Sequence, residues 1–334
     1  MTGFSTTDVA LDDVSLHVIH AGNPSDPTVL LVHGFPEVGY SWRHQIAALV
    51  DAGYHVVAPT LRGYGYSSVP DQVEAYGIKH LVGDLCQLLD YFGKDDAVFV
   101  GHDWGAMIVW DAARLQPARV RAVVGVSVPF VQWPAPPTQL FTAAFADRFF
   151  YMLYFQQPGL PEAELQADPQ RTMHTILHSL SGPGFANRDR SSTALPPMQG
   201  TGFLTTMPSP APLPLVGIEG PWLTAEDLEV YADAFAHSGF FGPISFYRNL
   251  DANFTATSML SPSDVTMPSF FIGGTLDVVM EMDPSGIARM QRSLPGFRGH
   301  VMIEGAGHWI QQEAPTACND ALLEFLRRLD GGSD

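Results

Sequence analysis

The chain has 334 residues, of which 46% are apolar and only 16% are charged, against roughly 25% charged in typical soluble domains. Asp and Glu outnumber Lys and Arg by 35 to 17, which gives a net charge of −18. This negative charge repels phosphate and argues against a nucleic acid or an anionic membrane surface as a partner. Two cysteines cannot build a disulfide framework, the first residues lack a secretory pattern, and the apolar runs are shorter than a membrane helix. We therefore expect a globular, cytoplasmic protein.

Short β-branched runs alternate with stretches of helical period in the first part of the chain. The pattern predicts strands at 28–34, 54–59, 96–101 and 120–128, and helices at 41–53, 78–93 and 105–117. Alternation of this kind is typical of an α/β fold with a mostly parallel central sheet and helices on both faces.

The alternation breaks from about 134 to 253, where aromatic helices surround a passage rich in Gly, Pro and Ser. Eight prolines lie between Ser181 and Pro221. An irregular passage of this length inside a compact domain usually serves as a lid or a binding surface. The alternation then resumes, with strands predicted at 267–274 and 299–305 and helices at 284–294 and 314–329. We therefore predict one α/β core, made of 1–133 and 253–334, interrupted by a helical cap at 134–252.

The strongest local motif is GHDWGA at 101–106, directly between a predicted strand and a predicted helix. It fits the Gly-x-nucleophile-x-Gly elbow, in which small flanking residues let a strand turn sharply into a helix and expose the central side chain. That central residue is Asp103, which could also simply cap the helix. Asp277 and His308 each follow a later strand, in the order nucleophile, acid, histidine. The three residues together predict a catalytic triad.

The loop HGFPE at 33–37 follows the first predicted parallel strand. In an arrangement of this kind, that loop supplies one backbone N–H of an oxyanion hole, and the residue after the nucleophile supplies another. We therefore predict that the backbone N–H groups of Phe35 and Trp104 act as the two donors.

A carboxylate at the elbow predicts substitution at a saturated carbon. A serine would leave a stable ether there, whereas an aspartate leaves an ester that water can still hydrolyse. Epoxides and alkyl halides both fit, but an opening epoxide also needs an acid, and a tyrosine is a neutral donor at pH 7. The predicted cap offers several tyrosines, among which spacing alone does not choose: Tyr151, Tyr154, Tyr231 and Tyr247.

Five motifs, HGFPE, VGHDWGA, YMLYFQQPG, SFYRNLD and GAGHWIQQEAP, occur in an order that spans nearly the whole chain. On these motifs the chain resembles the soluble epoxide hydrolases of the α/β-hydrolase fold, especially the short form of plants and bacteria. The resemblance implies that Asp103 attacks the epoxide, that His308 activates water and that Asp277 orients His308. It also selects Tyr151 and Tyr247 as the pair that holds and protonates the epoxide oxygen.

The same resemblance implies that Glu37 and His102 position the hydrolytic water. It implies a small-molecule epoxide as substrate, a vicinal diol as product, and no metal or cofactor. The twelve histidines show no spacing typical of metal ligands.

Two alternative functions stay open. Haloalkane dehalogenases share the Asp elbow, and Trp104 could form half of a halide clamp, but Phe35 has no polar side chain to complete it. The chain could also be a catalytically silent ligand-binding protein of this fold, although such proteins generally lose a member of the triad. Either a monomer or a homodimer fits the sequence.

Overall fold

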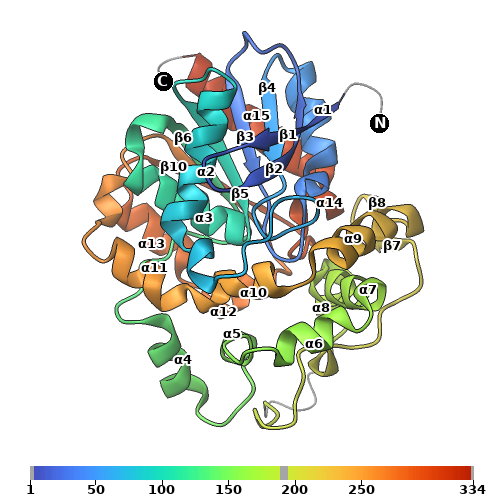
Figure 1. Cartoon of the computed structure of the whole chain (residues 1–334). Coiled ribbons are helices and arrows are strands. Elements are labelled where there is room, and N and C mark those ends of the chain that lie inside the picture. The colour runs from blue at the N-terminus through green and yellow to red at the C-terminus, as the bar shows by residue number, and fades with distance from the viewer. Residues whose placement is uncertain (1–3, 189–194, 332–334) are drawn as a thin grey trace.

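The computed structural model describes residues 4–188 and 195–331, and an eight-stranded sheet lies at its centre (Figure 1). The strand order is β1-β2-β4-β3-β5-β6-β9-β10. In this order, each pair of neighbouring strands from β4 to β10 is parallel. The pairs β1–β2 and β2–β4 at one edge are antiparallel. The strands are β1 (Ser5–Ala10), β2 (Ser15–Ala21), β3 (Thr28–Val32), β4 (His55–Pro59), β5 (Ala97–His102), β6 (Val120–Val126), β9 (Ser269–Gly274) and β10 (Phe297–Ile303).

Helices cover both faces of this sheet, as the alternating sequence pattern predicts. They are α1 (Arg43–Asp51) and α15 (Pro315–Asp330) on one face, and α2 (Ile78–Tyr91), α3 (Trp104–Leu115) and α13 (Gly286–Ser293) on the other. Successive side chains of a strand point to opposite faces, so a strand covered on both sides must be apolar throughout. In β3, Val29 and Leu31 pack into the α1–α15 layer, and Leu30 and Val32 into the other. The predicted α/β class is therefore confirmed.

The hairpin of β1 and β2 was not predicted from the sequence. Its pattern is weak because only alternate side chains, such as Val9, Leu16 and Val18, face the core. Such an edge hairpin exposes one face to solvent and lacks the continuous apolar run of the inner strands.

Between β6 and β9 the chain leaves the sheet and forms a set of helices that gather at one end of it (Figure 1). We call this segment the insert. It contains α4 (Pro137–Phe145), α5 (Tyr151–Tyr154), α6 (Leu160–Gln166), α7 (Pro169–Leu180), α8 (Gly182–Ala186), β7 (Leu215–Gly217), β8 (Gly220–Leu223), α9 (Ala225–Ser238), α10 (Phe241–Arg248) and α11 (Leu250–Thr257). The cap boundaries at 134 and 252 stay predictions, and residues 189–194 of the Pro-rich passage lie outside the described residues.

The remaining elements are short. They are α12 (Val278–Met282), α14 (Ile310–Glu313), and the 3₁₀ turns η1 (Gly39–Trp42), η2 (Val73–Tyr76), η3 (Pro117–Arg119), η4 (Leu204–Thr206) and η5 (Pro262–Asp264). No helix in the described part of the chain is long and apolar enough to cross a membrane.

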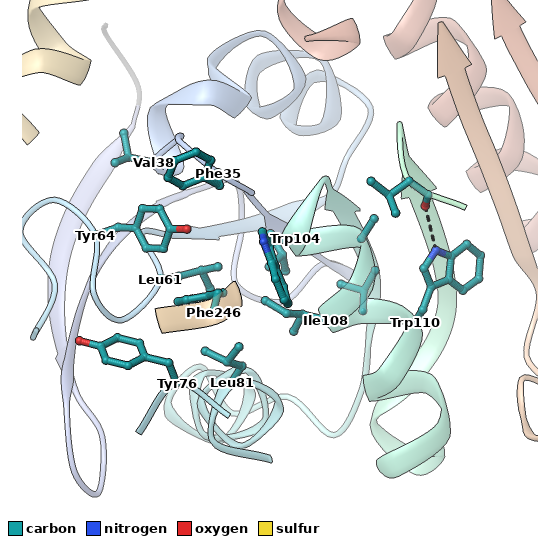
Figure 2. Close-up of a cluster of buried hydrophobic side chains, with 14 of the residues drawn as sticks. Phe35, Val38, Leu61, Tyr64, Tyr76, Leu81, Trp104, Ile108, Trp110 and Phe246 are labelled. Carbon is teal, nitrogen blue, oxygen red and sulfur yellow. Dashed lines mark hydrogen bonds between the residues drawn. The ribbon is translucent and has the colours of Figure 1, made fainter. Parts of the chain in front are cut away.

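The insert shares a hydrophobic core with the sheet domain. Phe246 of α10 lies among Leu61, Tyr64 and Trp104 (Figure 2), and its ring centroid is 5.3 Å from that of Tyr64 and 5.7 Å from that of Trp104. A Cβ atom on Gly242 would lie only 2.4 Å from the Cα of Gly63, so α10 also touches the loop after β4 backbone to backbone. This packing fixes α10, and with it the neighbouring Tyr247, against the sheet.

Candidate active site

Asp103 lies at a sharp turn between β5 and α3, with φ 52° and ψ −119°. Such a backbone conformation is strained for a residue other than glycine and is typical of functional sites. The flanking glycines make the turn possible: a Cβ on Gly101 would lie 2.2 Å from the carbonyl oxygen of Gly105, and a Cβ on Gly105 would lie 2.0 Å from that of Val32. The motif GHDWGA therefore forms the elbow geometry, with the carboxylate at its tip.

The three predicted triad residues lie together at the carboxyl ends of their strands. His308 Nδ1 is 3.0 Å from Asp277 Oδ1, and His308 Nε2 is 3.4 Å from Asp103 Oδ2. Asp277 caps α12 by accepting a hydrogen bond from the backbone N–H of Val279 at 2.9 Å. Asp277 and His308 are both buried, so the imidazole is held between two carboxylates.

The electrostatics of the site follow from this arrangement. Burial alone would lower the pKa of His308, but the carboxylates of Asp277 and Asp103 outweigh it and raise that pKa well above its usual value. Burial alone would raise the pKa of Asp103, but the hydrogen bonds and charge of His308 lower it overall. Asp103 is therefore ionised at neutral pH, as a nucleophile must be.

The loop after β3 closes directly over Asp103. The backbone N–H of Phe35 donates to Asp103 Oδ1 at 2.7 Å. A Cβ on Gly34 would lie 2.4 Å from the Cβ of Asp103, so only glycine allows this approach. Trp104 is the first residue of α3, where backbone N–H groups have no partner within the helix. Both predicted oxyanion donors thus adjoin Asp103, one of them already in contact with it.

The structure separates the four candidate tyrosines. The hydroxyl of Tyr154 donates to Glu164 Oε2 at 2.8 Å, and that of Tyr231 lies 2.8 Å from Gln312 Oε1, so both are used inside the protein. The rings of Tyr151 and Tyr247 instead face each other edge to face, with centroids 5.8 Å apart.

Tyr151 and Tyr247 also lie near Asp103. The Tyr247 ring packs edge to face on Phe35 and Trp104, at centroid distances of 5.5 Å and 5.1 Å. Burial, and then the negative charge of Asp103, raises the pKa of both phenols. Both groups therefore stay neutral at physiological pH. A neutral phenol keeps its O–H proton available for donation.

Glu37 and His102 form a fully buried pair beneath His308. His102 Nδ1 is 2.7 Å from Glu37 Oε2, and His102 Nε2 is 2.7 Å from the carbonyl oxygen of His308. Burial raises the pKa of Glu37, but the charge of His102 and its hydrogen bond lower it overall. The pair therefore supports the backbone of His308.

The sequence reasoning assigned no role to α14, the IQQE segment after His308. The side chains of Gln311 and Gln312 both donate to Glu37 Oε1 at 2.9 Å, and Glu313 is also buried. Buried polar side chains need hydrogen-bond partners, and Gln311 and Gln312 find theirs in the carboxylate of Glu37. The string QQE directly after the histidine motif was the signal available in the sequence.

Comparison with known proteins agrees with this geometry. Residues 27–315 match the family model of the alpha/beta hydrolase fold. The chain is 46% identical over 323 residues to epoxide hydrolase A of Mycobacterium tuberculosis, covering 96% of this chain and 97% of the relative. The chain belongs to the epoxide hydrolases of this fold. It is also 36% identical to an epoxide hydrolase of Caballeronia sordidicola, over 98% of this chain and 95% of the relative.

Solved epoxide hydrolase structures share the whole architecture. The crystal structure of epoxide hydrolase A from Mycobacterium thermoresistibile aligns with a TM-score of 0.88 at 46% identity, over 97% of this chain and 98% of the other. An epoxide hydrolase from an endophytic Streptomyces aligns with a TM-score of 0.91 at 35% identity, over 100% of this chain and 98% of the other. These epoxide hydrolase neighbours do not favour the dehalogenase or the silent binder.

Proposed function

We propose that the protein hydrolyses a small-molecule epoxide to a vicinal diol and that Asp103, His308, Asp277, Tyr151 and Tyr247 carry the reaction. One observation supports this most strongly. The ionised Asp103 lies at the elbow within reach of His308, while two neutral tyrosines approach it from the insert. A halide would not need these proton donors, because it leaves as a stable anion.

In the first half-reaction, an oxygen of Asp103 attacks a ring carbon and the C–O bond of the epoxide breaks. The epoxide oxygen takes a proton from Tyr151 or Tyr247, which leaves a phenolate and a β-hydroxyalkyl ester on Asp103. The second phenol stabilises the same oxygen by a hydrogen bond. This half-reaction does not need His308 as a base.

Ester formation also prepares the second half-reaction. The esterified Asp103 is neutral, so one of the two charges that raise the pKa of His308 is gone. His308 then releases its proton to solvent more readily and acts as a base, held by Asp277. It takes a proton from water, and the hydroxide attacks the ester carbonyl carbon of Asp103.

Release of the product restores the enzyme. The negative charge on the ester carbonyl oxygen is stabilised by the backbone N–H groups of Phe35 and Trp104. The tetrahedral intermediate expels the diol, and the proton taken by His308 from water passes to the phenolate. His308 then regains a proton from solvent, because Asp103 is ionised again. One epoxide and one water are thus converted to one diol. Glu37 and His102 influence the hydrolytic water through the backbone of His308, which His102 binds.

The cytoplasm is the compartment we propose for this reaction. Cys86 and Cys318 are both free, as expected in a reducing environment.

The decisive experiment measures the intact mass of the His308→Gln variant after brief incubation with aryl and alkyl epoxides and, separately, with haloalkanes. Loss of the base should let the ester accumulate. We expect a gain equal to the whole epoxide mass, and no gain when Asp103→Asn is added. A gain equal to the haloalkane less HX, with nothing from epoxides, would overturn the proposal in favour of a dehalogenase. No adduct from any compound would favour a silent binder.

A further inference from the structure

The backbone of His308 is bonded to the insert as well as to the sheet domain. Its N–H donates to the carbonyl oxygen of Leu180, at the end of α7, at 2.9 Å. Its carbonyl oxygen accepts hydrogen bonds from His102 Nε2 at 2.7 Å and from Ser127 Oγ at 2.8 Å. The position of the catalytic base therefore depends on a corner of the insert between α7 and α8.

A single carboxylate joins that corner to the histidine loop. Glu313, which is 1% exposed, accepts a hydrogen bond from the backbone N–H of Gly182 at 2.7 Å. It also accepts from the N–H groups on either side of His308, that of Gly307 at 3.4 Å and that of Trp309 at 3.1 Å. Glu313 thus fixes both neighbours of the catalytic residue relative to the insert.

The two backbones that Glu313 joins are in direct contact. A Cβ on Gly307 would lie 2.1 Å from the backbone nitrogen of Gly182 and 2.4 Å from the carbonyl carbon of Ser181. A Cβ on Gly182 would lie 2.3 Å from the carbonyl oxygen of Gly305. Glycine at both positions lets the corner and the loop pack without side chains between them, so a shift of one displaces the other.

Burial of this carboxylate is costly. Desolvation raises the pKa of Glu313 to about 7, although the three backbone N–H groups act in the opposite direction. An apolar side chain of similar size would avoid that desolvation cost but would leave three buried N–H groups without an acceptor. The carboxylate is therefore suited to holding backbone donors rather than to filling space.

We propose that Glu313 is a positioning residue for ester hydrolysis, holding the corner Leu180–Gly182 and the loop Gly307–Trp309 together so that His308 stays aligned with the hydrolytic water. This inference rests on the proposed role of His308 as the base. Glu313 acts through backbone groups. The first half-reaction depends on Asp103 and the two tyrosines, whose hydrogen bonds do not involve Glu313.

The proposal is tested by single-turnover kinetics of the Glu313→Gln variant with an epoxide substrate. A glutamine has one acceptor oxygen and would point its NH₂ group at a backbone N–H, so at least one of the three donors loses its partner. We expect the ester to form within about twofold of the wild-type rate, because a small displacement of the His308 loop slows only the step that needs His308 aligned. Ester hydrolysis should fall about tenfold or more. Quenched samples analysed by intact mass report both rates.

Glu164→Gln is the matched control. Glu164 also accepts two backbone N–H groups, those of Phe203 and Leu204, but it lies within the insert away from the His308 loop. Both half-reactions of this variant should stay within about twofold of wild type, since no group that its carboxylate binds belongs to the His308 loop. Glu313→Asp keeps the charge and should hydrolyse the ester at a rate between those of Glu313→Gln and wild type. It also provides the test if Glu313→Gln does not fold.

Amide hydrogen exchange gives a second measurement. Exchange at 180–182 and 305–309 should increase in Glu313→Gln more than in the strands of the sheet. The inference is overturned if both half-reactions slow in parallel, if neither changes, or if Glu164→Gln has the same effect. Failure of the proposed function looks different, because then the wild-type enzyme and His308→Gln form no ester with epoxides at all.

Discussion

Removal of the hydroxyl groups of Tyr151 and Tyr247 tests how the epoxide is opened. A Tyr→Phe change keeps the ring, so the edge-to-face packing of Tyr247 on Phe35 and Trp104 should persist. What is lost is one hydrogen bond to an oxygen that becomes negatively charged, worth about 1.5–3 kcal/mol. Since about 1.4 kcal/mol corresponds to a factor of ten, each single variant should form the ester about 10- to 150-fold more slowly.

The double variant is more informative than either single one. With one tyrosine left, the oxygen still receives a proton, whereas with none it must leave as a bare alkoxide. We therefore expect the double variant to lose at least the product of the single losses, about 10²-fold or more. Ester hydrolysis, measured separately, should be affected less, because in the proposed mechanism His308 rather than the tyrosines activates the water.

Rapid mixing with an epoxide, followed by acid quench and intact-mass analysis, gives the rate of ester formation directly. Tyr154→Phe is the control, because its hydroxyl is bonded to Glu164 inside the insert. The reasoning would be refuted if the double variant formed the ester within about threefold of the wild-type rate, a loss below 1 kcal/mol. It would also be refuted if Tyr154→Phe lost as much as Tyr151→Phe.

Three further outcomes are expected. Gly34→Ala should slow ester formation by about 100-fold or more while the circular dichroism spectrum stays native, because the added Cβ would lie 2.5 Å from Asp103 Oδ1. A near-normal rate of ester formation would contradict the close approach of Gly34 to Asp103. The rate of ester formation should be nearly independent of pH from 6 to 9, because the pKa of Asp103 is lowered and its carboxylate stays ionised. The rate of ester hydrolysis should rise with pH, because His308 must lose its proton to act as a base. A single-turnover rate of ester hydrolysis that falls as the pH rises would contradict this prediction. Asp84→Leu should destabilise the fold by about 3–5 kcal/mol in urea titrations, because it breaks the buried ion pair with Arg62, which is 1% exposed; a loss below about 1 kcal/mol would contradict that assignment.

Local patterns in the sequence predict most of the sheet domain. The inner strands β3, β4 and β5 are buried along their whole length and consist mostly of apolar residues because helices cover both faces, and this makes them easy to recognise. The elbow around Asp103 is equally local, since its glycines lie two residues on either side. The edge hairpin of β1 and β2 was missed because one of its faces is open to solvent.

The parts of the site that depend on distant contacts could not be predicted from residue patterns. Spacing left four tyrosines equivalent, and only the resemblance selected Tyr151 and Tyr247. The structure gives the physical reason, since Glu164 and Gln312 occupy the hydroxyls of the other two. Glu313 was missed for the same reason, because its partner Gly182 lies 131 residues away in the chain and offers only a backbone N–H.

In the proposed mechanism the insert contributes to both half-reactions, but through different segments. In that mechanism Tyr151 of α5 and Tyr247 of α10 present phenols to the epoxide oxygen, whereas Leu180 and Gly182 contact the backbone around His308 and the carboxylate that holds it. Because α10 is packed into the core through Phe246 and the α7–α8 corner is fixed by Glu313, the insert is held to the sheet domain at both places. A displacement of α10 would therefore affect ring opening, and a displacement of the corner would affect ester hydrolysis. Measuring the two rates separately distinguishes which attachment a substitution has loosened.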